Sequence, residues 1–103
     1  MITEITYDYT KIEAIIGPYQ GHDDFLYGFY VIMTATDGIN IVSAKRNLEL
    51  NLSEEVYKPF AEYTKEEILE KVNSLVDKYD VKSYLDRQLN ILIHQPKNVN
   101  IEL

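Results

Sequence analysis

The chain contains no cysteine and no tryptophan, and it has only three prolines and four glycines. Without cysteine, disulfides and thiolate metal ligation are excluded, and a reducing compartment is allowed. A membrane-spanning helix needs about 18 or more consecutive apolar residues, and no run approaches that length, so we expect no membrane segment. Glu4 and Asp8 stand where a secretory signal would carry basic and then apolar residues, so we expect a cytoplasmic protein.

Recognisable catalytic motifs are missing as well. No serine stands in a nucleophile-elbow context, and the glycine spacing matches neither a dinucleotide fold nor a phosphate loop. One cluster, His22-Asp23-Asp24, could supply metal ligands, but the other histidine, His94, has no carboxylates at ligand spacing. We therefore expect no enzyme activity, no cofactor and no metal. A small metal-assisted enzyme at His22, Asp23 and Asp24 remains an alternative.

Positive charge is scarce and scattered. Ten lysines and arginines oppose 17 aspartates and glutamates, which gives a net charge of −7. Lys45-Arg46 is the only adjacent basic pair, whereas a nucleic-acid-binding face needs a basic stripe. Direct binding to nucleic acid or to an anionic membrane is therefore not expected.

Negative charge, in contrast, is concentrated in residues 49–70. Seven glutamates lie there against Lys58 and Lys65, a local net charge of −5. Glu66 and Glu67 suit the start of a helix, where acidic side chains are favourable. The other acids need another explanation, either a solvated surface or a docking surface for a basic partner.

The nine tyrosines suggest the same two alternatives, because tyrosine is common both in strands and at interfaces. Tyr57 and Tyr63 fall among the acids. If the segment is a docking surface, its predicted contact residues are Glu49, Glu54, Glu55, Tyr57, Glu62, Tyr63, Glu66 and Glu70.

The β-structure is predicted to centre on a hairpin within residues 25–50. Asp37-Gly38 is a favoured two-residue turn and would place Thr36 opposite Ile39. One face then carries Phe29, Val31, Met33, Ala35, Val42 and Ala44, and the opposite face carries Tyr30, Ile32, Thr34, Ile39 and Ile41. Residues 2–7 alternate weakly as a strand, residues 11–16 are ambiguous, and residues 17–21 have the breakers of a loop.

Two helices are expected in the C-terminal half. Thr64 and Glu67 form a capping box, and apolar spacing continues to Tyr79, which predicts a helix over 64–79. A second helix is expected over about 81–94, although residues 90–94 could instead open a strand. Pro96 ends it, and the alternation in residues 99–103 suits a short edge strand.

These patterns predict a single α+β domain over residues 1–103. An antiparallel sheet of three to five strands surrounds the 25–50 hairpin, and two C-terminal helices pack on one face. No motif matches a known family closely enough to transfer site residues.

The favoured function is a small acidic, non-enzymatic binding protein. By analogy of size and composition, it would be an inhibitor of the anti-defence or immunity type that docks on a basic, nucleic-acid-handling protein. The second hypothesis is an oligomeric accessory subunit, for example a homodimer, that uses the apolar outer face of the hairpin.

Overall fold

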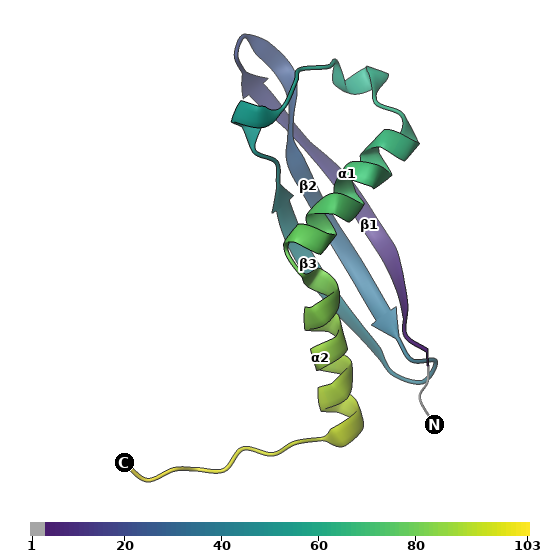
Figure 1. Cartoon of the computed structure of the whole chain (residues 1–103), viewed down its shortest axis with the longest axis vertical. Coiled ribbons are helices and arrows are strands. Elements are labelled where there is room, and N and C mark those ends of the chain that lie inside the picture. The colour runs from purple at the N-terminus through teal and green to yellow at the C-terminus, as the bar shows by residue number, and fades with distance from the viewer. Residues whose placement is uncertain (1–3) are drawn as a thin grey trace.

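The computed structural model describes residues 4–103 and confirms the α+β class. Three antiparallel strands form one sheet in the order β1-β2-β3, and two helices pack against it (Figure 1). In chain order the elements are β1 (Thr6–Tyr19), β2 (His22–Thr36), β3 (Ile41–Glu49), the 3-10 turns η1 (Leu52–Glu54) and η2 (Phe60–Glu62), α1 (Lys65–Lys78) and α2 (Val81–His94).

Strand β1 is much longer than the sequence indicated. The predicted loop over residues 17–21 is wrong, because the strand runs through Gly17 and Pro18 and turns only at Gln20 and Gly21. Both turn residues have positive φ angles, 50° and 81°, as a tight two-residue hairpin turn requires. Pro18 is tolerated because β1 is an edge strand. Of the predicted strand over residues 2–7, residues 2 and 3 lie outside the described residues.

The β2–β3 register differs from the prediction by two residues. Thr36 faces Ile41 rather than Ile39, so residues 37–40 form a four-residue loop. The Asp37 carboxylate accepts hydrogen bonds from the backbone N–H groups of Ile39 and Asn40, and these bonds hold the longer loop closed. A shift of two preserves the strand faces, so the predicted core face is confirmed, whereas Ile39 belongs to the loop.

Both C-terminal helices are confirmed. The capping box of α1 is present, since Thr64 Oγ1 accepts from the backbone N–H of Glu67 and the Glu67 carboxylate accepts from that of Thr64. Asp80, which has a left-handed backbone conformation, separates α1 from α2. Helix α2 extends to His94, so residues 90–94 are helical. The predicted edge strand over residues 99–103 is wrong, because residues 95–103 are exposed and pair with no strand within residues 4–103.

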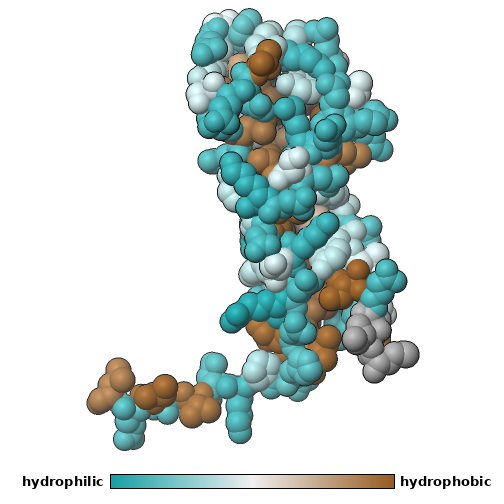
Figure 2. Space-filling model, in the orientation of Figure 1, coloured by the Kyte–Doolittle hydropathy of each residue, from teal (hydrophilic) through white to brown (hydrophobic). Residues whose placement is uncertain are grey.

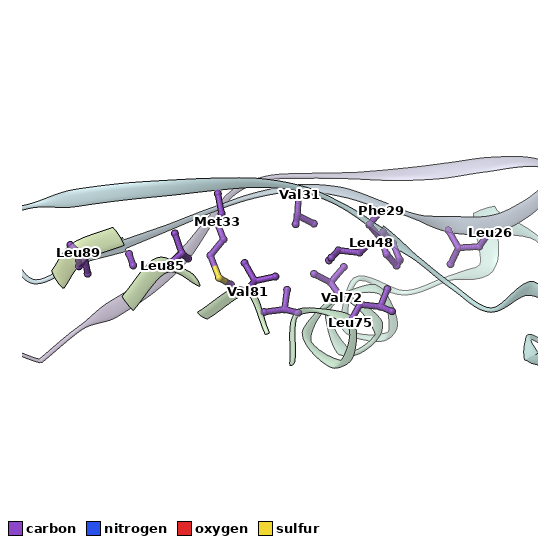
Figure 3. Packing of buried hydrophobic residues seen from close by; sticks show 13 residues of the cluster. Leu26, Phe29, Val31, Met33, Leu48, Val72, Leu75, Val81, Leu85 and Leu89 are labelled. Atoms are coloured by element: carbon purple, nitrogen blue, oxygen red, sulfur yellow. The ribbon is translucent and has the colours of Figure 1, made fainter. Parts of the chain in front are cut away.

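The hydrophobic core is a single layer between the sheet and the two helices. Figure 3 shows Phe29, Val31, Met33 and Leu48 pointing from the sheet toward the residues of the helices. The helices contribute Val72, Leu75, Val76, Val81, Leu85 and Leu89. Among residues 4–103, neither helix lies on the other face of the sheet (Figure 3). In the described part of the chain no helix is long and apolar enough to cross a membrane.

Candidate protein-binding site

The acidic segment forms an arch at one end of the molecule. After β3 the chain passes through η1 and η2 before it enters α1, and this arch lies beside the tip of the β1–β2 hairpin (Figure 1). Asn51 begins η1, its side chain accepting from the backbone N–H of Ser53. Leu50, Phe60 and Tyr63 of the arch are partly buried against the hydrophobic core, and polar contacts also hold the arch in position.

Asp24 supplies a polar anchor for the arch. Its carboxylate accepts a 2.9 Å hydrogen bond from the backbone N–H of Phe60 and a 2.8 Å bond from the Tyr57 hydroxyl. These two donors, the Phe60 N–H first, hold the pKa of Asp24 below its ordinary value. The same bond to Asp24 raises the pKa of the Tyr57 phenol. The start of β2 is therefore tied to the segment that joins β3 to α1.

His22 takes part in this anchor through its ring. The imidazole stacks on Tyr57 with the ring centroids 3.5 Å apart and the planes 8° from parallel. His22 and Asp24 thus both contact the arch, and Asp23 is exposed between them. Among residues 4–103 no group of three or more histidine or carboxylate side chains is placed to hold a metal ion.

Two ion pairs connect the arch to α1. Lys71 of α1 lies 3.1 Å from the Glu55 carboxylate, and both side chains are largely covered. Lys58 pairs with Glu67, the residue that closes the capping box of α1. The Lys58 ammonium, followed by the Thr64 N–H, lowers the pKa of Glu67. Glu55 and Glu67 are therefore used in holding the arch against the helix.

A groove lies between the arch and α1, and we call it the acidic groove. It encloses about 380 Å³ and is lined by Leu50, Glu55, Glu67, Glu70, Lys71, Ser74 and Leu75. Two of its carboxylates are paired with lysines, and Glu70 is exposed at its side without an ion pair among the described residues. Apolar walls from two leucines and a free carboxylate suit the stem and head of a lysine or arginine side chain.

The structure brings together only some of the predicted contact residues. Glu55 and Glu70 line the acidic groove. Tyr57 is engaged by Asp24 and His22, and Tyr63 is half-buried under the Lys58 ammonium, 4.7 Å from its ring centroid. The remaining four glutamates are exposed and form no ion pair with residues 4–103; they are Glu49 at the end of β3, Glu54 in η1, Glu62 in η2 and Glu66 in the first turn of α1.

Sequence reasoning missed the residues that fix the site in space. Asp24 is 33 residues from Tyr57 and 36 from Phe60, and Lys71 is 16 from Glu55. No local spacing rule covers such separations. The available signal was an excess of acids around two lysines, which indicated charge but not pairing.

The surface over the arch and α1 is predominantly hydrophilic (Figure 2). The outer face of the sheet, named in the second hypothesis, is mixed. Tyr30, Ile32 and Thr34 are half-buried along β2, and Ile41 is 68% exposed on β3. Lys11 and Glu13 form an exposed ion pair on β1 beside them.

No family model, curated protein or solved structure gave a significant match to the chain.

Proposed function

We propose that the protein is a small acidic inhibitor that docks on a basic, nucleic-acid-handling protein through the acidic groove and the carboxylates around it. One observation carries the proposal. Five exposed glutamates of the segment lack an internal ion pair with residues 4–103, although Lys58 and Lys71 are close by and are committed to Glu67 and Glu55. Unpaired carboxylates at this density repel one another, so a basic partner would relieve that repulsion.

The shape of the site supports a specific contact as well as a general attraction. The ion pairs and the Asp24 anchor hold the arch in place before binding, which lowers the ordering cost of association. A lysine or arginine of the partner would enter the acidic groove beside Glu70, with Glu54, Glu62 and Glu66 contacting its flanking basic residues. Carboxylates so arranged would occupy positions that nucleic-acid phosphates otherwise take. The lack of cysteine fits a cytoplasmic location.

The experiment is capture followed by displacement. The immobilised protein is incubated with extract from its native host, and a retained protein is purified and bound to labelled DNA or RNA. We expect the free chain to release the labelled nucleic acid from that protein. A triple variant with Glu54, Glu62 and Glu70 changed to lysine should retain nothing and release nothing.

A control variant with the same charge change separates local from general electrostatics. Glu4, Asp8 and Glu102 are exposed and lie outside the arch, so changing them to lysine raises the net charge equally. This control should still bind and displace. If it fails as badly as the triple variant, net charge alone accounts for binding and the proposed site is wrong.

A further inference from the structure

Val56 is the most exposed large apolar residue of the arch. Its side chain is 87% exposed, although the residues before and after it, Glu55 and Tyr57, are half-buried. The other strongly exposed large apolar side chains of residues 4–103 lie outside the arch, in the β2–β3 loop, on β3 and in the C-terminal tail. The arch therefore presents one large apolar side chain to solvent.

Both neighbours of Val56 are fixed to other parts of the fold. The Glu55 carboxylate lies 3.1 Å from the ammonium of Lys71 in α1. The Tyr57 hydroxyl donates a 2.8 Å hydrogen bond to the carboxylate of Asp24, near the start of β2. Val56 is thus held between a residue attached to the helix and a residue attached to the hairpin.

The backbone conformation directs Val56 away from the fold. Glu55 has φ −86° and ψ 138°, which is an extended conformation, and successive side chains along an extended chain point in opposite directions. Because Glu55 and Tyr57 both contact the fold, the side chain between them points to solvent. Valine is branched at Cβ and has few rotamers, so its ordering in an interface costs little entropy.

The same part of the arch carries the unpaired negative charge. Glu54 and Glu62 are exposed and form no ion pair with residues 4–103. Glu55, next to Val56, lines the acidic groove. Val56 therefore projects from the proposed docking surface, beside the groove and next to exposed carboxylates.

Charged and apolar groups contribute differently to a complex. Exposed carboxylates steer and orient a basic partner, but each exposed ion pair adds little affinity. The centre of a protein interface is depleted of charge and more apolar, and its rim is polar. An apolar side chain surrounded by carboxylates matches an apolar pocket that is bordered by lysines or arginines.

We propose that Val56 is the apolar contact of the docking surface and enters a pocket of the basic partner that is bordered by lysine or arginine side chains. This inference rests on the proposed function, because it assigns Val56 to the same partner. It adds specificity, since a partner must offer an apolar pocket as well as positive charge. Glu54 then contacts the basic border of the pocket, and the acidic groove receives a basic side chain beside it.

The test is the affinity of the captured basic protein for Val56→Ala, measured over a range of salt concentrations. Removal of two buried methyl groups should weaken binding about tenfold. Because the lost contact carries no charge, the dependence of the affinity on salt should stay that of wild type. Val56→Thr keeps the shape but places a hydroxyl group in the pocket, so it should weaken binding as well.

Ile39→Ala is the matched control. Ile39 is 89% exposed, as open as Val56, but it lies in the β2–β3 loop, at the opposite end of the sheet from the arch (Figure 1). Its replacement should change neither the affinity nor the salt dependence. Both alanine variants should melt at the wild-type temperature, because neither side chain is buried.

The Glu54, Glu62, Glu70→Lys variant distinguishes the two proposals. If it loses binding while Val56→Ala and Val56→Thr bind like wild type, the docking surface stands and the apolar contact is refuted. If it binds like wild type while the Val56 variants do not, the proposed function fails and Val56 remains a contact. An equal loss in Ile39→Ala would also overturn the assignment to Val56.

A measurement on the free chain tests whether Val56 is held in place before binding. Its backbone amide should have an NMR order parameter of about 0.85, the value of a rigid backbone. A value below about 0.6 would show that the anchored neighbours do not fix Val56, and it would overturn the proposal.

Discussion

Replacement of Leu85 by alanine tests whether α2 is held by the core described above. Leu85 is fully buried, at 0% exposure, between α2 and the sheet. Deleting such a side chain costs the lost transfer free energy and leaves a cavity, together about 3 kcal/mol. A domain of this size has about 5–15 kcal/mol of stability, so a fifth or more of it should be lost. The melting temperature should fall by about 12–24 °C.

Leu92 provides a matched control on the same stripe of α2. It lies two turns after Leu85 but is 46% exposed. Its replacement by alanine should cost about 1 kcal/mol or less. Urea unfolding at one low protein concentration measures the stability of both variants. The urea concentration at the midpoint should fall, while the slope of the unfolding free energy against urea concentration should stay constant. Equal losses at the two positions would refute the packing of α2 on the sheet.

Three other predictions concern single contacts. Asp24→Asn should lower the melting temperature at pH 7. The pKa of Asp24 is lower in the folded state than in the unfolded state, so its carboxylate stabilises the fold above the unfolded pKa of about 3.9. This stabilisation is lost as the pH falls through the folded pKa, so the difference in melting temperature between wild type and Asp24→Asn should disappear in acid. Gly28→Ala should destabilise the fold more than Gly17→Ala. A Cβ at residue 28 would lie 2.2 Å from the backbone carbonyl oxygen of Leu48, whereas a Cβ at residue 17 would lie 3.3 Å from the Tyr27 ring, which can move. Equal melting temperatures of the two variants would contradict this prediction. Thr64→Ala should cost about 1 kcal/mol in urea unfolding through loss of the capping box, and an unchanged midpoint would mean that the box contributes nothing.

Local signals predicted the helices well. The Thr64–Glu67 capping box and the apolar spacing that followed it located α1 and its buried residues Val72, Leu75 and Val76. The same reasoning predicted α2 over about 81–94 but left residues 90–94 open between helix and strand, and the structure shows that they are helical. These signals suffice because a helix is specified by contacts within one or two turns.

Strand boundaries depended on less local chemistry. Gly17 and Pro18 are loop residues by composition, but an edge strand tolerates both. The Asp37-Gly38 pair suggested a two-residue turn, and the Asp37 carboxylate instead closes a longer loop. The predicted inner and outer faces of β2 and β3 were still correct, because the register error was two residues, which is one full side-chain period of a strand.

The candidate site was predicted by charge alone. The sequence showed an acidic segment but not which glutamates are paired, because Lys71 reaches Glu55 only after α1 folds back beside the arch. It likewise assigned Tyr57 to the partner surface, whereas the ring stacks on His22 and the hydroxyl bonds to Asp24. Contacts between residues this far apart are set by the tertiary fold.

The most direct test of the proposed docking surface is the affinity of the captured basic protein for three forms of this chain. Wild type and the Glu4, Asp8, Glu102→Lys control should bind within a few-fold of each other at low salt, and both should weaken as salt is raised. The Glu54, Glu62, Glu70→Lys variant should lose at least about a hundredfold in affinity, the equivalent of about 2.8 kcal/mol. Equal affinity of all three forms would contradict the proposal that this acidic surface is the binding site.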